Sequence, residues 1–403
     1  MSFTTDSLVK EYSNITKKVL PSKTFENKFI YSFIHGAKCE IFGPLEKEYI
    51  IKFIDKDKNE LIYETVSKNN HWHKPNIEYF VNWRIEVYDK ETNELLDSHD
   101  FDAKGKNVFI TLDSSAIGDT LAWLPVIKQF EEKHKCNIIV STFHNDWFYK
   151  EYPEWEFVSP GMQAFDIYAL YCLGWFYNDQ QIELHKNPQE VKNLPLQQTA
   201  SDILGLEYKE SKPRISTPKK DRPVEEKYVC IAPHASAHAK YWMYPGGWQT
   251  IIDYLNDKGY KVLMITHEVL GDEWHDSKLG GTLQNVIDKT GNGPLSDRIN
   301  DIKHADLFIG LGSGLSWISW AVRTPTILIS GFSAPHTEFQ DCERIFTPDP
   351  DNTCNSCFNR EWLNPGDWEW CPDHKDTDRH FECSKTIEPQ TVINSINKFL
   401  KIS

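Results

Sequence analysis

Residues 107–143 read NVFITLDSSAIGDTLAWLPVIKQFEEKHKCNIIVSTF. The first seven residues form a short apolar run, which is typical of a buried β-strand. A polar loop and a helical stretch follow, and a second strand-like run closes the segment at 136–143. Because buried strands that alternate with helices form parallel, doubly wound sheets, this stretch predicts an α/β fold.

The same alternation returns after residue 227. Strands are expected at 227–233, 260–268, 306–314 and 324–332, with helices at 246–259, 296–305 and 315–323. Two Rossmann-like halves in one chain predict a cleft between them, because ligands of such folds bind at the carboxyl ends of the strands. The segment 211–227 is rich in Pro and charge, and we expect it to link the two halves.

The region before residue 105 has a different pattern. Short β-branched or aromatic runs are separated by turn signals, such as DKDKNE at 55–60 and DKETNE at 89–94. We expect strands at 28–35, 37–43, 47–56, 60–66, 77–89 and 94–101. They predict a small antiparallel sheet domain, whereas polar residues 1–25 are expected to be ordered only by docking. The expected domains are a β-rich domain at 1–105 and Rossmann-like domains at 106–222 and 223–403.

Composition limits the classes of partner. The chain has 403 residues and a net charge of −15, which argues against nucleic acid or an anionic membrane as the main partner. No apolar run approaches the length needed to span a bilayer. The N-terminus lacks the apolar core of a signal peptide. We therefore expect a cytoplasmic protein without membrane insertion.

Four of the 9 cysteines are clustered near the C-terminus. They are Cys354, Cys357, Cys371 and Cys383. This spacing is typical of a four-cysteine metal site, because one tight turn can present the first two thiolates. Two disulfides or four unrelated buried thiols are the alternatives, but an odd cysteine total favours reduced thiols. We expect a structural metal finger at about 350–385, and the thiolate ligands alone favour zinc.

The first candidate functional loop follows the strand at 107–113. Gly118 permits close backbone approach, and Asp119 lies at the turn from strand to helix. There its carboxylate could take a proton from an attacking hydroxyl. The alternative is that Asp119 only caps the helix. Asp113, nearer the strand end, is expected to be a structural loop acid.

Two further candidate loops belong to the second half. Ser236 and Lys240 follow the strand at 227–233, and a hydroxyl with a compact cation suits a pyrophosphate. A surface lysine without a role is the alternative for Lys240. A glycine-rich turn before the helix at 315–323 offers free N–H groups and a positive helix dipole to a phosphate, although many such turns bind nothing. The turn consists of Gly312, Ser313, Gly314 and Leu315.

These motifs resemble known families. IGDTLAWLP at 117–125 resembles the GD-x-L-x-x-LP turn of family 9 glycosyltransferases, the heptosyltransferase group. LGSGLSWISWA at 311–321 resembles their donor loop, with Trp317 where the common pattern has His. Three stretches are more specific, and with the N-terminal strands they resemble the bacterial autotransporter heptosyltransferases over nearly the whole chain from about residue 28. These are AKYW at 239–242, ISGFSAPHTEF at 329–339 and WCPDHKDTDRHFECSK at 370–385.

The resemblance implies a GT-B fold with an added N-terminal domain. It implies cytoplasmic transfer of heptose from ADP-heptose to serine hydroxyls of an autotransporter adhesin passenger domain. It also implies a large ring-like homo-oligomer, and one iron ion per chain, in place of zinc, held by the four cysteines. Asp119 matches the family's catalytic acidic residue and Lys240 its phosphate lysine. The segments 233–240 and 266–275 diverge from the family pattern, which bears on the sugar more than on the reaction class.

The predicted mechanism is inverting transfer in which Asp119 deprotonates the acceptor hydroxyl. Lys240, Ser236 and the amides of 312–315 stabilise the departing ADP, so no divalent cation takes part in the chemistry. One alternative is a transferase of the same fold that uses another nucleotide sugar or a glycan acceptor. The others are a non-catalytic adhesin-binding module and a metal-sensing or redox protein.

Overall fold

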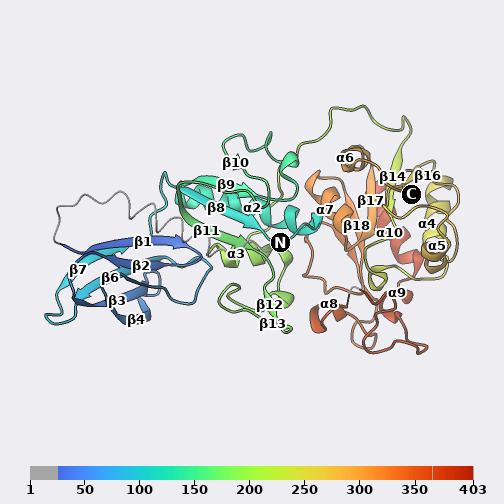
Figure 1. Cartoon of the computed structure of the whole chain (residues 1–403). Helices are drawn as coiled ribbons and strands as arrows, with labels where there is room; N and C mark the ends of the chain where they lie inside the picture. The colour runs from blue at the N-terminus through green and yellow to red at the C-terminus, as the bar shows by residue number, and fades with distance from the viewer. Residues whose placement is uncertain (1–25, 365, 403) are drawn as a thin grey trace.

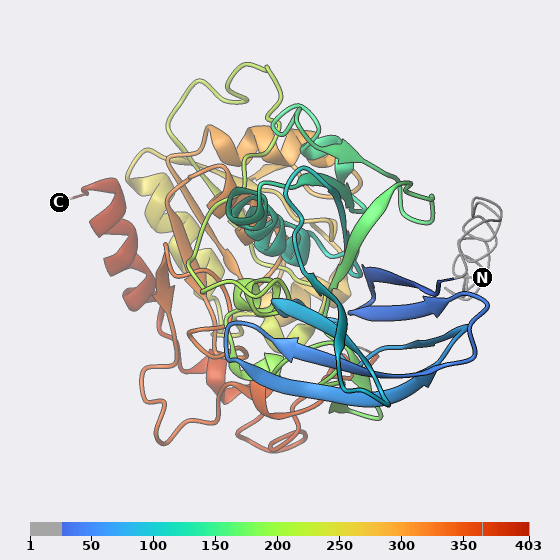
Figure 2. The ribbon, with the colours of Figure 1, turned by 90° about the vertical axis from the view of Figure 1, so that its left-hand side faces the viewer.

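The computed structural model describes residues 26–364 and 366–402, so the expectation for residues 1–25 lies outside the described part. The chain forms three main sheets. The sheets have four, seven and six strands. Figure 1 shows the first at one end of the molecule and the last at the other end, with the seven-stranded sheet extending from beside the first into the middle. Figure 2 views the molecule from the end that carries the four-stranded sheet.

The four-stranded sheet is antiparallel, with the order β4-β3-β6-β7. Its strands are β3 (Glu48–Asp55), β4 (Glu60–Lys68), β6 (Trp83–Asp89) and β7 (Leu95–Asp100). Along β3 and β6 every second residue is buried, because successive side chains of a strand point to opposite faces. Ile51 pairs with Val87 and Phe53 with Ile85, and all four are fully buried.

The expected strand at 77–89 begins only at Trp83. Before it, the amide of Glu78 donates to the carbonyl of His185, and the amide of Phe80 donates to the carbonyl of Ile203 at the end of a helix. The backbone of this stretch is therefore paired with a loop and a helix end next to the neighbouring sheet and does not continue a regular ladder.

The seven-stranded sheet is mixed, with the order β10-β9-β8-β11-β1-β2-β5. Its strands are β1 (Lys28–Ile34), β2 (Lys38–Phe42), β5 (His71–His73), β8 (Asn107–Leu112), β9 (Asn137–Ser141), β10 (Glu156–Phe157) and β11 (Ile167–Leu173). β1 pairs parallel to β11, with Phe33 opposite Ala169. β1 and β2 were expected in a separate N-terminal sheet, and the residues of β5 were expected in a connection of that sheet. Instead, these three strands extend the seven-stranded sheet beyond β11 and cover the edge that β11 would otherwise leave unpaired.

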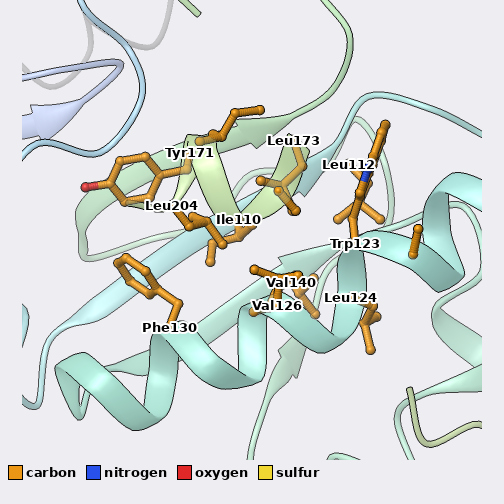
Figure 3. Packing of buried hydrophobic residues seen from close by; sticks show 14 of the residues in the cluster. Ile110, Leu112, Trp123, Leu124, Val126, Phe130, Val140, Tyr171, Leu173 and Leu204 are labelled. Atoms are coloured by element: carbon orange, nitrogen blue, oxygen red, sulfur yellow. The ribbon is translucent and has the colours of Figure 1, made fainter. Parts of the chain in front are cut away.

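Helices α2 (Ile117–His134) and α3 (Leu196–Ile203) pack against this sheet. Figure 3 shows Val126 and Phe130 of α2 directed toward the side chains of Ile110, Val140 and Tyr171 on the strands. All five residues are almost completely buried. Burial of an apolar side chain of this size contributes roughly 1.5–3 kcal/mol, so this layer fixes the start of α2 firmly relative to the strand ends.

Short elements complete this part of the chain. They are the hairpin β12 (Tyr177–Asn178) and β13 (Gln181–Ile182) and the 3-10 helices η1 (Asn145–Trp147) and η2 (Val191–Asn193). The predicted linker, 211–227, has neither helix nor strand.

The six-stranded sheet is parallel, with the order β16-β15-β14-β17-β18-β19. Its strands are β14 (Tyr228–Ala232), β15 (Lys261–Met264), β16 (Ile287–Asp288), β17 (Leu307–Leu311), β18 (Thr326–Ile329) and β19 (Glu343–Ile345). Numbered within this half, the order is 3-2-1-4-5-6, which is typical of Rossmann folds. β14 and β17 are buried throughout, as expected for central parallel strands.

Helices surround the six-stranded sheet. They are η3 (His238–Lys240), α4 (Gly247–Asp257), α5 (Glu273–Leu279), α6 (Leu295–Lys303), α7 (Gly314–Ala321), α8 (Cys357–Arg360), α9 (Glu382–Lys385) and α10 (Pro389–Leu400). The strands and helices expected after residue 227 are all present, and the α/β class is confirmed. Among the described residues, no helix combines the length and apolar character that crossing a bilayer requires.

Candidate active site and metal centre

A cleft of about 870 Å³ lies at the carboxyl ends of the seven- and six-stranded sheets. Its walls come from the loops after β8 and β11 on one side and after β14, β15, β17 and β18 on the other. In both sheets, strand order reverses at this place, and open α/β sheets bind ligands at such points. All seven predicted catalytic and donor-binding residues line the cleft: Asp119, Ser236, Lys240, Gly312, Ser313, Gly314 and Leu315.

Asp119 lies in the first turn of α2. The N-cap of this helix is Ala116, and Asp119 is therefore not the capping residue that the alternative reading expected. Burial raises the pKa of Asp119, while a hydrogen bond from Ser114 and the charge of Lys240 act in the opposite direction. A carboxylate whose pKa is raised toward the working pH is a better proton acceptor in catalysis than an ordinary surface aspartate.

Lys240 ends η3, directly after β14. It lies in the cleft wall and is half-buried, so it is not a freely exposed surface lysine. Burial lowers the pKa of Lys240, and the negative charges of Glu338 and Asp119 oppose this change. Its ammonium group is thus influenced by a carboxylate of each half, and an anionic ligand in the cleft would stabilise the charge that burial disfavours.

The glycine-rich turn leads from β17 into α7. Ser313 is the N-cap of α7 but its side chain makes no capping bond, and its buried Oγ has no hydrogen-bond partner among the described residues. The amides of Gly314 and Leu315 open the helix, where no carbonyl one turn earlier can accept from them. These donors, with the positive end of the helix dipole, make the turn suitable for a phosphate group.

Two glycines allow the N-terminal ends of α2 and α7 to meet across the cleft. A Cβ atom on Gly118 would lie 2.8 Å from Cδ1 of Trp317, and one on Gly314 would lie 2.9 Å from Cβ of Ile117. Both distances are too short for real side chains. Because neither glycine has a side chain, the two helix ends bring Asp119 and the predicted phosphate-binding turn 312–315 into one site.

The structure adds cleft residues that were not among the predicted site residues. They include Trp175, His234, Thr266, Phe332, Glu338 and Phe358. Trp175 follows β11, a strand that the sequence pattern did not predict. Glu338 belongs to the family-specific stretch 329–339, which was a signal that this loop matters.

The cysteine segment contains a compact group of metal-ligating atoms. In the described part of the chain, one oxygen of Asp373 and the sulfurs of Cys354 and Cys357 all lie within 4.8 Å of one another. The two sulfurs are 4.0 Å apart. Two thiolates bound at about 2.3 Å to one tetrahedral ion would lie about 3.8 Å apart, so the pair fits a metal.

The other two cysteines lie outside this compact group. Burial, together with the smaller effect of charges on Cys357 and Cys371, raises the pKa of Cys383 to about 12, which places three sulfurs in one electrostatic neighbourhood. A cation would favour the thiolates that burial disfavours. The structure thus brings the predicted ligands together in part and adds Asp373, whose carboxylate accepts from Arg360 at 2.6 Å.

The cysteine segment also joins the two halves at the cleft. Phe358, next to Cys357, packs against Trp175 with ring centroids 5.7 Å apart. The Asn359 side chain donates to the carbonyl of Lys192 at 2.6 Å, and the Lys192 ammonium donates to the carbonyl of Glu361 at 2.9 Å. One wall of the cleft therefore depends on the segment that carries the predicted metal ligands.

Comparison with known proteins places this site in a class. A model of glycosyltransferase family 9 (heptosyltransferase) matches residues 174–340, which include β14, β15, β17 and β18 and their cleft loops. Together with the paired doubly wound sheets, this match makes the protein an α/β glycosyltransferase.

The similarity to one relative covers nearly the whole length of both chains. The autotransporter heptosyltransferase TibC of Escherichia coli O78:H11 (strain H10407 / ETEC) is 32% identical over 401 residues, which are 97% of this chain and 95% of TibC. The chain belongs to the family of autotransporter heptosyltransferases.

Solved structures agree. A crystal structure of TibC, described as an iron-containing dodecameric glycosyltransferase, matches with a TM-score of 0.82 at 29% identity and covers 95% of this chain and 98% of TibC. A TibC complex with ADP-D-β-D-heptose matches with a TM-score of 0.80 at 30% identity, over 95% and 99% of the two chains. BimC of Burkholderia thailandensis, named an inactive autotransporter heptosyltransferase, is 31% identical over 74% of this chain and 70% of its own.

Proposed function

We propose that this protein transfers heptose from ADP-heptose to serine hydroxyls of an autotransporter adhesin, with inversion at the anomeric carbon. The observation that carries the proposal is that one cleft joins the half-buried carboxylate of Asp119 in one half to a lysine and a free helix N-terminus of the other. The TibC complex with ADP-D-β-D-heptose, similar over 95% of this chain, supports this choice of donor. In this proposal the two halves form a GT-B arrangement, with donor binding in 223–403 and acceptor binding in 106–222.

Asp119 is the general base of the proposed reaction. Its carboxylate takes the proton of the acceptor serine hydroxyl, and the oxygen attacks the anomeric carbon from the face opposite the phosphate. The bond from that carbon to the phosphate oxygen breaks, and ADP leaves with the electron pair. The new glycosidic bond has the inverted configuration, and the proton remains on Asp119 until solvent takes it.

The donor-binding residues act on the leaving group. Lys240, Ser236 and the amides of the 312–315 turn would stabilise the negative charge that grows on ADP, and these donors are already in place before reaction. Such fixed dipoles and a cation supply the charge stabilisation that a divalent ion supplies in other transferases. The reaction then needs no metal among the reacting atoms.

Replacing Lys240 by Met is expected to weaken binding of ADP-heptose and of ADP roughly 10- to 100-fold alike, because a hydrogen bond to a charged group is lost from a buried site. Isothermal titration calorimetry measures both affinities. The control is Lys258→Met, which removes the same charge from an exposed position after α4. Equal affinities for Lys240→Met and the unaltered protein would contradict the assignment.

For the cysteine segment we propose one iron ion per chain, held by Cys354, Cys357, Cys371 and Cys383, with a structural role. Support comes from the spacing of the first pair and from the description of TibC as iron-containing. When bound, the ion supplies a rigid cross-link between parts of the segment. We also propose a large homo-oligomer, since TibC is described as dodecameric.

The test of the function is intact-mass and peptide mass spectrometry of an adhesin passenger fragment co-expressed with this protein. The host strains either contain or lack ADP-heptose biosynthesis. A heptose-sized addition on serine that disappears with the pathway is the expected result. Addition of another sugar would leave a transferase with a different donor. No addition by a folded, metal-loaded protein would favour a glycan acceptor or a non-catalytic module, as the name of BimC indicates for that relative.

A further inference from the structure

The buried carboxylate of Glu338 lies at the cleft without a role in the mechanism above. Glu338 belongs to the loop after β18, lines the cleft and is 8% exposed. One carboxylate oxygen accepts from the hydroxyl of Ser333 at 2.7 Å, and the other accepts from Arg344 at 2.9 Å. Each oxygen keeps a free lone pair, because a carboxylate oxygen can accept about two hydrogen bonds.

Gly312 makes room for this carboxylate. A Cβ atom at position 312 would lie 2.4 Å from Oε1 of Glu338. Any side chain at the start of the phosphate-binding turn would therefore displace the carboxylate from its place. Because Gly312 has no side chain, the side chain of Glu338 from the neighbouring loop can reach the start of the phosphate-binding turn.

The position along the sheet edge tells which part of a nucleotide sugar meets Glu338. The residues predicted to bind the pyrophosphate follow β14 and β17, the two central strands of the sheet. The loop after β15, which contains Thr266, lies on one side of them, and the loop after β18 lies on the other. The nucleoside and the sugar extend from the pyrophosphate in opposite directions, so each occupies one of these sides.

The β18 side is where the two halves meet. The carbonyl of Thr337 accepts from the amide of Leu196 at 2.8 Å, across the two halves. Leu196 and Glu338 both line the cleft, as does Trp317, which packs against Gly118 beside Asp119. The sugar must lie on the side where donor and acceptor residues converge, because its anomeric carbon is the atom attacked. Glu338 is therefore on the side of the sugar.

The negative charge of Glu338 determines which part of a nucleotide sugar it can bind. A carboxylate repels the pyrophosphate, whereas sugar hydroxyls are neutral donors and suit its free lone pairs. The charge of Glu338 also acts on Lys240, so the carboxylate lies near the residues predicted to bind the pyrophosphate. We propose that Glu338 accepts hydrogen bonds from hydroxyls of the donor sugar and thereby determines sugar specificity; this inference rests on the proposed function.

The test compares ADP-heptose with ADP, both titrated by calorimetry into Glu338→Gln. We expect ADP-heptose to bind roughly 10- to 100-fold more weakly, as for loss of a charge-assisted hydrogen bond, and ADP to bind within about twofold of the unaltered protein. Glu338→Asp keeps the charge opposite Arg344 but withdraws the oxygens, so the same preferential loss is expected if Glu338→Gln does not fold. Glu343→Gln, on β19 beyond the cleft, is the matched control and should change neither affinity.

A purely structural role would lower both affinities equally, together with the melting temperature, and would overturn the inference. Unchanged binding of ADP-heptose to both Glu338 variants would overturn it as well. These outcomes leave the proposed function intact as long as the unaltered protein binds ADP-heptose more tightly than ADP. An unaltered protein that binds ADP but not ADP-heptose would instead show that the proposed donor is wrong, and the inference falls with it.

Discussion

Asp119→Asn is expected to lower the rate of heptose transfer roughly 10²- to 10⁴-fold, because the amide cannot accept the proton of the acceptor hydroxyl. The donor does not react with this side chain before transfer, so the affinity for ADP-heptose should stay within a few-fold of the unaltered value. Single-turnover transfer to a passenger peptide measures the rate, and calorimetry measures donor affinity. Asn is nearly isosteric with Asp, so the contact between α2 and α7 should be preserved.

Asp113→Asn is the control for this substitution. Asp113 lines the same cleft from the loop between β8 and α2 but is exposed. Its replacement should change transfer by less than about tenfold, consistent with a loop acid outside the chemistry. Near-normal turnover by Asp119→Asn, or an equal loss in both variants, would remove Asp119 from the role of base.

The raised pKa of Asp119 also predicts a direction for pH dependence. Burial raises this pKa, so the fraction of deprotonated base falls as the pH is lowered toward it. Transfer should therefore decline on the acid side at a higher pH than an ordinary aspartate would give. In Asp119→Asn this acid limb should be absent from the residual activity.

Cys371→Ser is expected to remove most of the bound metal and to destabilise the protein by on the order of 4 kcal/mol, because a structural metal site stabilises only the folded state. Metal content by mass spectrometry and thermal unfolding measure these changes. Assembly by size-exclusion chromatography should weaken in parallel. Because Phe358 and Asn359 connect the cysteine segment to the other half, transfer should fall as the cleft wall loosens.

Cys136→Ser is the matched control. Both thiols are buried, at 5% exposure for Cys136 and 8% for Cys371, but Cys136 lies in the half without the cysteine segment. Its replacement should leave the metal content unchanged and destabilise by about 1–3 kcal/mol, as for an unpaired buried hydroxyl. A Cys371→Ser protein that is fully folded and assembled but inactive would indicate a direct role of the metal in the reaction.

The sequence predicted the second half more accurately than the first. In β14, β17 and the helices between the strands, apolar periodicity and glycine-rich turns follow one another closely in sequence, so local pattern and fold agree. β11 was not predicted from the sequence. β1 was expected in a separate antiparallel sheet, but in the structure it pairs with β11. That pairing joins residues more than a hundred positions apart, which no local pattern records.

The candidate site likewise contains some residues that the sequence could indicate and others that it could not. Asp119, Lys240 and the 312–315 turn could be proposed from the sequence because each follows an apolar strand, and strand ends of parallel sheets gather at one edge. Glu338 could not be proposed in this way. Its position depends on a missing side chain at Gly312 and on the partners Ser333 and Arg344, which only packing brings together.

The sequence by itself determined the α/β class, the candidate residues for proton transfer and phosphate binding, and the cysteine spacing. These depend on composition and on neighbours within a few residues, which the chain order fixes. Only the tertiary structure decided that α2 and α7 meet through Gly118 and Gly314, and that the cysteine segment forms a wall of the cleft. Such contacts arise from the packing of surfaces distant in sequence, where a difference of one methyl group decides whether two helices can touch.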